Sequence, residues 1–213
     1  QLAMSAPLRS AEIQNLYKLL ESGELNEVLR KGEALISRGR SNPDGNFLML
    51  LNVLGAGHLS YREFDKAHKY IEEGLSIDKN PHLLNTKASI FLKQMRNKDA
   101  LETIDSAIRL EGTNPEFYRS RAMILLACES YEELTRFVET RPIKQYFQYD
   151  YHLLKGACEW RLGNYEDGER NLEIAIGLDP LNSDAYLQLS IMHRINSDYE
   201  KVIKTLNRLG EDQ

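Results

Sequence analysis

The residues that could do chemistry do not form a catalytic pattern. The five histidines are scattered over the predicted helices, and none forms an H-E-x-x-H motif or pairs with a cysteine at the spacing of metal ligands. We expect a structural or solvent-facing role for each, namely His58, His68, His82, His152 and His193. The two cysteines, Cys128 and Cys158, fall in apolar helical segments, which is typical of buried thiols in a reducing compartment.

Glycines and carboxylates also lack the context that catalysis needs. Gly55-Ala56-Gly57 has no preceding strand and no following Lys-Ser or Lys-Thr pair, so it predicts tight packing within a helix and not a phosphate loop. The pairs Glu72-Glu73 and Glu132-Glu133 fall on polar turns of predicted helices, where charge is usually solvated. We therefore expect no enzymatic activity, no cofactor and no metal ion.

Composition narrows the class of protein. Of the 213 residues, 42% are apolar and 28% charged, which fits a folded chain and not a disordered one. The net charge is −5 and no long basic run occurs, so we expect no nucleic-acid partner. The most apolar stretch, Phe47 to Leu59, is too short for a membrane span. We expect a cytoplasmic location, with the periplasm as an alternative.

A sequence repeat predicts the secondary-structure elements that position any binding residue. Tyr118, His152 and Tyr186 recur every 34 residues, and a small residue follows each of them four positions later. Those small residues are Ala122, Gly156 and Ser190, and a tyrosine comes nine positions after each, at Tyr131, Tyr165 and Tyr199. A fixed period of this length predicts stacked helical hairpins.

The segment 149–180 shows the content of one repeat. Its first apolar-periodic run ends at Gly163-Asn164, a helix stop and turn, and its second run ends before Pro180, which bars the preceding residue from the helical region. Small residues at the crossing allow the two helices to approach closely. The segment resembles the tetratricopeptide repeat at Gly156, Gly163-Asn164-Tyr165, Ala175 and Asp179-Pro180.

The resemblance implies an all-α fold, a right-handed superhelical solenoid of antiparallel helical hairpins with about six repeats. Each hairpin buries its apolar face only against its neighbours, so several are needed for stability. We expect residues 1–8 to be disordered or a tag remnant, and residues 9–213 to form the array. Its approximate units are 9–46, 48–80, 81–114, 115–148, 149–182 and 183–213.

The resemblance also implies where a partner binds. In this family the first helix of each repeat lines a concave groove and the second faces outward. Carried over by position, the groove residues are Met49, Asn52, Ala56, His82, Asn85, Ser89, Glu116, Arg119, Met123, Leu153, Ala157, Trp160, Arg161, Leu187, Ile191 and Arg194. Of these, we predict that the partner-binding residues are Asn52, Asn85, Arg119, Met123, Trp160, Arg161 and Arg194.

This set suits an extended or helical peptide. Asparagine amides can bond to a peptide backbone, arginines can pair with carboxylates, and methionine and tryptophan supply apolar anchors. The alternative is that Trp160 and Met123 belong to the core between repeats. The family's clamp for heat-shock chaperone tails needs lysines that are out of register here. The asparagine ladder of O-linked sugar transferases breaks at Arg119 and Leu153.

The fourth repeat departs from the pattern. Its second helix, 131–140, is closed early by Pro142. Four aromatic residues then fall within six positions, at Tyr146, Phe147, Tyr149 and Tyr151. One interpretation is local packing of the next helix, and the other is an aromatic contact site at the edge of the groove.

The leading functional hypothesis is a non-catalytic interaction scaffold or adaptor that binds a partner protein or peptide. One alternative is the accessory region of a larger enzyme, such as a glycosyltransferase or sulfotransferase. Another is an oligomeric assembly factor or secretion chaperone. Because no amphipathic helix follows Leu209 and Gly210, a homodimer or a neighbouring domain could contact the C-terminal end.

Overall fold

The structure, a computed structural model, describes residues 6–211, and these form thirteen α-helices and no β-strand. They fall into two compact units, which divide between Thr113 and Asn114. None of the described helices combines the length and the apolar character needed to cross a membrane. Each unit is described by itself below.

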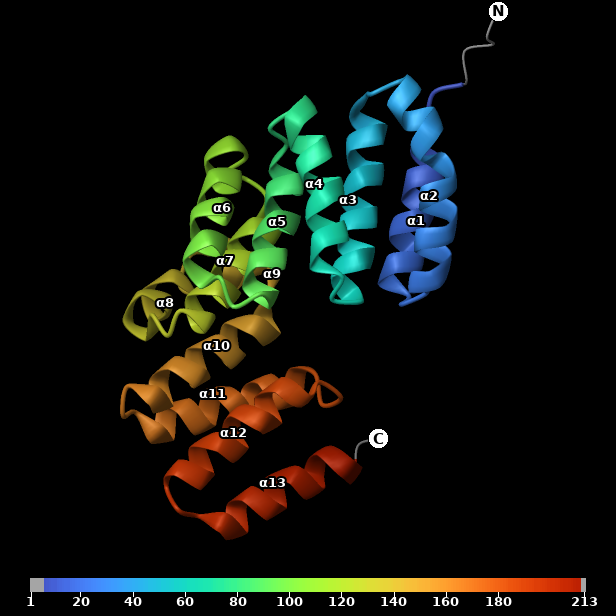
Figure 1. Cartoon of the computed structure of the whole chain (residues 1–213). Helices are drawn as coiled ribbons and strands as arrows, with labels where there is room; N and C mark the ends of the chain where they lie inside the picture. Colours follow the sequence, from blue (N-terminus) through green and yellow to red (C-terminus); the bar gives the residue numbers. More distant parts are fainter. Residues whose placement is uncertain (1–5, 212–213) are drawn as a thin grey trace, which may run out of the picture. The chain divides into compact units, whose positions relative to one another are not determined.

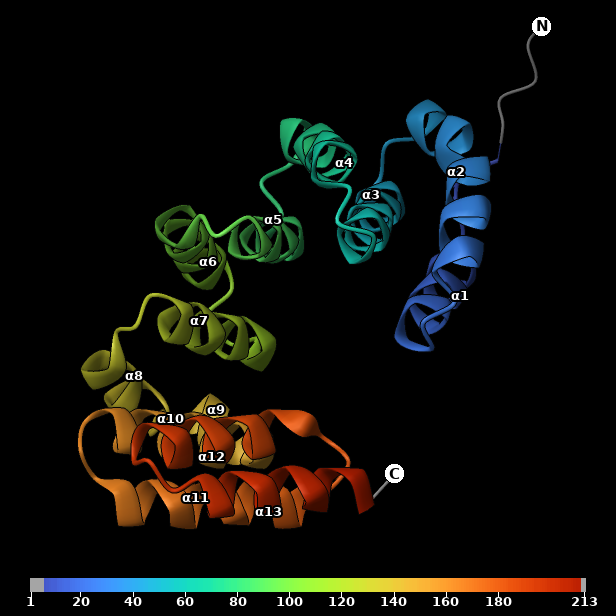
Figure 2. The ribbon, with the colours of Figure 1, turned by 60° about the horizontal axis from the view of Figure 1, so that its bottom comes forward.

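The first unit consists of three helical hairpins (Figure 1). In each hairpin the first helix packs against the second, and within this unit α1 contacts α3 and α3 contacts α5. We call α1, α3 and α5 the first-helix layer of this unit, and Figure 2 shows α3 and α5 side by side within it. The helices are α1 (Ser10–Glu21), α2 (Leu25–Ser41), α3 (Gly45–Ser60), α4 (Phe64–Ile77), α5 (Pro81–Lys93) and α6 (Asn97–Leu110).

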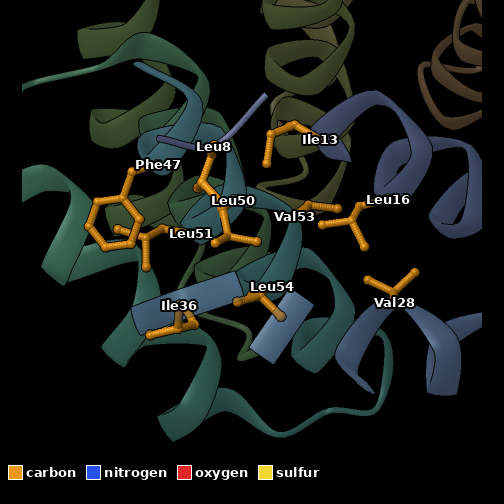
Figure 3. Packing of buried hydrophobic residues seen from close by; sticks show 10 residues of the cluster. All are labelled: Leu8, Ile13, Leu16, Val28, Ile36, Phe47, Leu50, Leu51, Val53 and Leu54. Atoms are coloured by element: carbon orange, nitrogen blue, oxygen red, sulfur yellow. The ribbon is translucent and has the colours of Figure 1, made fainter. Parts of the chain in front are cut away.

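The core of the first two hairpins explains why they pack. Figure 3 shows ten buried side chains from the segment before α1 and from α1, α2 and α3. Leu8 is among them and is 3% exposed, so the chain before α1 takes part in the core. The expectation of disorder over residues 1–8 otherwise concerns residues 1–5, which lie outside the described residues.

The second unit has three hairpins and one additional short helix. Its first-helix layer is α7, α10 and α12, in which α10 contacts both of the others. The helices are α7 (Pro115–Ala127), α8 (Tyr131–Phe137), α9 (Arg141–Tyr146), α10 (Gln148–Arg161), α11 (Tyr165–Leu178), α12 (Ser183–Ile195) and α13 (Tyr199–Glu211). The second helix predicted over 131–140 ends earlier, at Phe137, and Pro142 lies in the first turn of α9, where proline is tolerated.

The repeat also appears in the helix ends. Asn80, Asn114 and Asn182 each precede a first helix, and each side-chain oxygen accepts a backbone N–H of the first turn. The turn inside a hairpin uses a left-handed residue, which is Gly163 (φ 95°) in the α10–α11 hairpin but Met95 (φ 61°) in the α5–α6 hairpin. The left-handed backbone conformation of the turn is therefore retained in the α5–α6 hairpin, although the residue there is not glycine.

Candidate functional site

The residues predicted to bind a partner all lie on the two first-helix layers. Asn52 and Asn85 are on α3 and α5 of the first unit, and the others are on α7, α10 and α12 of the second. The structure divides them into side chains that bond within the protein and side chains that remain available to a ligand. This division depends on their neighbours and not on their place in the repeat.

Asn52 belongs to a buried hydrogen-bond network that joins three first helices. Its side-chain nitrogen donates to the Tyr17 hydroxyl on α1 at 2.8 Å, and its oxygen accepts from the Thr86 hydroxyl on α5 at 2.6 Å. Asn52 is only 8% exposed, and burial raises the pKa of Tyr17 despite the Asn52 hydrogen bond. The Asn52 amide therefore connects the hairpins of the first unit.

Asn85 lies at the same place in the next repeat but has a different environment. Its side chain is half-buried, and its side-chain oxygen, Oδ1, is enclosed without a hydrogen-bond partner in the part of the chain that the structure describes. A buried acceptor without a donor costs free energy. Asn85 therefore has an unused acceptor, which a ligand reaches only if the side chain turns.

Arg119 is engaged with α10 of its own unit. Its Nε donates to Oδ2 of Asp150 at 2.7 Å, and its guanidinium lies 5.7 Å from the centre of the Phe147 ring. Asp150 is 8% exposed, so this pair brings a buried carboxylate and a half-exposed arginine together between α7 and α10. Met123, one turn along α7, is half-buried.

Trp160 is part of the core of the second unit. It is 5% exposed and packs in a cluster that includes Leu172 of α11 and Leu189 of α12. A Cβ atom added at Gly168 would lie 2.9 Å from that of Trp160, so α11 has glycine where the α10 backbone at Trp160 comes close. The environment of Trp160 is thus that of the inter-repeat core.

Arg161 lies against the exposed side of that core. The centre of its guanidinium is 4.1 Å from the Trp160 ring and 5.3 Å from the Tyr131 ring. Its Nη1 donates to Oε1 of Gln188 on α12 at 2.7 Å and to the carbonyl of Ala157 at 3.1 Å. Gln188 could not be predicted from the sequence, because no amide recurs at this place in the other repeats.

In the first-helix layer of the second unit, the most exposed large apolar side chains lie on α12. Leu187 and Ile195 are 46% and 55% exposed, and Ile191 between them is half-buried. Arg194 is exposed, and its side chain has no ion pair or hydrogen bond with any residue from 6 to 211. This face therefore combines uncovered apolar area with an available cation.

The four aromatic residues after Pro142 differ in exposure. Tyr151 is buried and donates its hydroxyl to Glu139 at 2.8 Å, and the Tyr149 hydroxyl accepts the N–H of Ala185 at 3.2 Å. Burial, the largest cause, raises the pKa of Tyr149 to about 12. Phe147 lies beneath Arg119, and Tyr146 is 58% exposed. Only Tyr146 thus presents most of its side chain to solvent.

A polar cavity of about 230 Å³ lies between α2, α3 and α4 of the first unit. His58 borders it, with Nδ1 3.2 Å from Glu63 and Nε2 3.5 Å from Glu33, and its ring stacks on Tyr70. The cavity is lined by both acidic and basic side chains. Over residues 6–211, no three His, Cys, Asp or Glu side chains are grouped as metal ligands.

The sequence matches no family model and no curated protein. The fold, however, is similar to several solved structures. A tetratricopeptide repeat protein from Parabacteroides merdae has a TM-score of 0.71 at 16% identity, over 94% of this chain and 78% of that one. PilF from Pseudomonas aeruginosa also has a TM-score of 0.71, at 14% identity, over 94% of this chain and 90% of that one.

A third similar structure is YrrB, a tetratricopeptide repeat protein with an unusual peptide-binding site. Its TM-score is 0.60 at 16% identity, over 85% of this chain and 93% of that one. At sequence identities this low, the similarity shows a shared fold and does not extend to function. Together with the paired helices, the recurring asparagine caps and the 34-residue sequence period, they show that this chain has the tetratricopeptide-repeat fold.

Proposed function

We propose that this protein is a non-catalytic interaction module that binds a segment of a partner protein on its first-helix layers. The observation that carries the proposal is Asn85, whose side-chain oxygen is enclosed and has no donor within the described residues. When the Asn85 side chain turns toward the surface, a backbone N–H of a bound segment would satisfy this oxygen, and the Asn85 amide would in turn donate to a backbone carbonyl.

The comparison with YrrB supports this proposal, because that protein of the same fold is described as having a peptide-binding site. The buried Tyr17–Asn52–Thr86 network supports it too, since it fixes α1, α3 and α5 relative to one another. A surface fixed before binding loses less conformational entropy when the ligand arrives.

The experiment starts from peptides selected from an unbiased displayed library on the intact chain. Asn85→Ala should weaken the selected peptides that bind the first unit by about tenfold, the loss of about one hydrogen bond. Asn207→Ala, the same change at an exposed position of α13, is the control and should leave affinity unchanged. If no peptide is selected, or if none depends on Asn85, the proposal fails.

A second candidate function is self-association or contact with a neighbouring domain through α13. Tyr199, Ile203 and Leu206 are 63%, 61% and 44% exposed and follow one side of that helix. Sedimentation velocity over a range of concentrations tests it. Ile203→Glu should abolish any concentration-dependent association, and a monomer at all concentrations would exclude the homodimer.

We also propose a cytoplasmic location. Both cysteines are free thiols, and burial, the largest cause, raises the pKa of Cys158 to about 11. Unpaired cysteines are usual where the environment is reducing. Fractionation of the source cells tests this, and recovery of the protein from an oxidising compartment would contradict it.

A further inference from the structure

The guanidinium of Arg161 is held in place without being neutralised. Two aromatic rings lie against it, and its two hydrogen-bond acceptors, Gln188 and Ala157, are uncharged. By contrast, Arg170 and Arg208 of the same unit pair with Asp167 and Glu173. The positive charge of Arg161 therefore lacks a carboxylate within the described residues.

One edge of this guanidinium is open. Both intramolecular hydrogen bonds use Nη1, and Nε and Nη2 have no partner among residues 6–211. These two nitrogens form the flat fork that matches the two oxygens of a carboxylate. Since the rings and Gln188 already fix the side chain, a carboxylate would bind with little further loss of side-chain entropy.

An apolar row lies on α12, the helix that carries Gln188. Leu187, Ile191 and Ile195 recur every fourth residue along α12; Leu187 and Ile195 are about half exposed, and Ile191 between them is half-buried. Gln188, which holds Arg161, lies within the span of this row, and the row is about 12 Å long at the rise of an α-helix. A segment that covers the whole row would therefore reach Arg161 near Leu187, at one end of the row.

We propose that Arg161 and the apolar row of α12 form a binding site for a partner segment with an acidic side chain flanked by branched apolar side chains. The inference rests on the proposed interaction function and specifies its ligand in the second unit. The acidic side chain pairs with Nε and Nη2 of Arg161, and the apolar side chains cover Leu187, Ile191 and Ile195. The available charge of Arg194 favours a second acidic residue near the far end of the row.

The test uses an array of synthetic peptides of about fifteen residues applied to the intact chain. Each peptide carries one aspartate or glutamate with leucines three and four positions away, and matched versions replace the acid by glutamine or lysine. All ends are blocked, and a second series has a free carboxyl end. The variants are Arg161→Gln, Arg161→Lys and the control Arg170→Gln, which removes an exposed arginine from α11.

We expect the wild type to prefer acidic peptides over their glutamine versions by about tenfold or more, as for a charge-assisted hydrogen-bond pair. Arg161→Gln should abolish that preference and Arg161→Lys should restore only part of it, because lysine keeps the charge but not the fork. Arg170→Gln should keep it in full. Thermal unfolding of each variant separates a lost contact from a lost fold.

The outcomes separate this inference from the proposed function. If library peptides bind but acidic versions have no advantage, or the advantage survives Arg161→Gln, the acidic site is wrong while the interaction module stands. If only the peptides with a free carboxyl end bind, the site recognises a chain terminus, and the proposal of an acidic side chain is wrong. If a second copy of the chain covers the row, Leu187→Asp will disperse a dimer and the peptides will not bind; that result also overturns the site.

Discussion

Gly156 of α10 and Gly168 of α11 face each other at the crossing of their helices. A Cβ atom at Gly168 would lie 3.1 Å from the carbonyl oxygen of Gly156 and 3.0 Å from the backbone nitrogen of Trp160. Backbone atoms on both helices therefore set this distance, and no flexible side chain can give way. The crossing also brings Trp160, and with it Arg161, to its place beside α12.

Gly168→Ala should lower the free energy of unfolding by about 2 kcal/mol, because the added methyl group forces two helices apart. The matched control is Gly177→Ala on the same helix, where an added Cβ meets nothing within 4 Å. That change should leave stability unchanged or raise it by up to about 1 kcal/mol, since alanine favours the helix over glycine. Urea unfolding followed by circular dichroism measures both, and equal effects would contradict the close-crossing argument.

Two asparagines at the same place in successive repeats should respond differently to alanine. Asn52→Ala leaves the buried hydroxyl of Thr86 without its acceptor, and the Tyr17 hydroxyl keeps only its 3.4 Å bond to the Met49 carbonyl. The change should cost about 1–3 kcal/mol of unfolding free energy. Asn85→Ala removes an acceptor that has no donor, so the free energy of unfolding should stay the same or rise. Chemical denaturation of the two variants tests the contrast, and a larger loss for Asn85→Ala would refute it.

The period of 34 residues carries enough information to predict the hairpins. It encodes small residues at the crossings, such as Gly156, and the asparagine caps before the first helices. It also encodes turn positions, although Met95 shows that the left-handed residue need not be glycine. The hairpins can be predicted from the sequence because each of these features lies within a single repeat.

The roles of the site residues could not be predicted in the same way. Whether an inward asparagine is available depends on the helices beside it, and one partner of Asn52 is Tyr17, which comes from the first and least regular repeat. Arg161 depends likewise on Gln188, a residue with no counterpart in the pattern. A repeat predicts where a side chain lies, but non-repeating neighbours decide what it bonds to.

Arg119→Ala should destabilise the second unit, because it leaves the buried carboxylate of Asp150 without its cation. We expect a loss of about 2 kcal/mol, below the cost for a fully buried pair, since the Arg119 side chain is 43% exposed. Adding Asp150→Asn to this variant should recover part of the loss, because the uncharged amide is easier to bury. A double-mutant cycle of unfolding free energies measures the coupling, and additive effects would show that the pair contributes nothing.

Glu12 should make the first unit sensitive to acid. Its carboxylate accepts hydrogen bonds from Arg38 at 2.9 and 3.2 Å and from the backbone N–H of Arg9 at 2.9 Å. The Arg38 bonds first, and the Arg9 bond second, lower the pKa of Glu12 from 4.5 to about 2. Because the unfolded chain takes up this proton at a higher pH than the folded one, the contribution is complete above about pH 5 and is lost as the pH falls toward 2.

Glu12→Gln should therefore be less stable than the wild type at neutral pH, and the difference should shrink as the pH is lowered from 5 to 3. Other carboxylates also titrate in this range, so the informative quantity is the difference between the two proteins in urea unfolding at each pH. Arg38→Gln removes the donor instead of the acceptor and should flatten the pH dependence in the same way. Parallel curves for Glu12→Gln and the wild type would mean that the Glu12–Arg38 pair does not set the acid sensitivity, because only a pKa difference between folded and unfolded chains makes stability depend on pH.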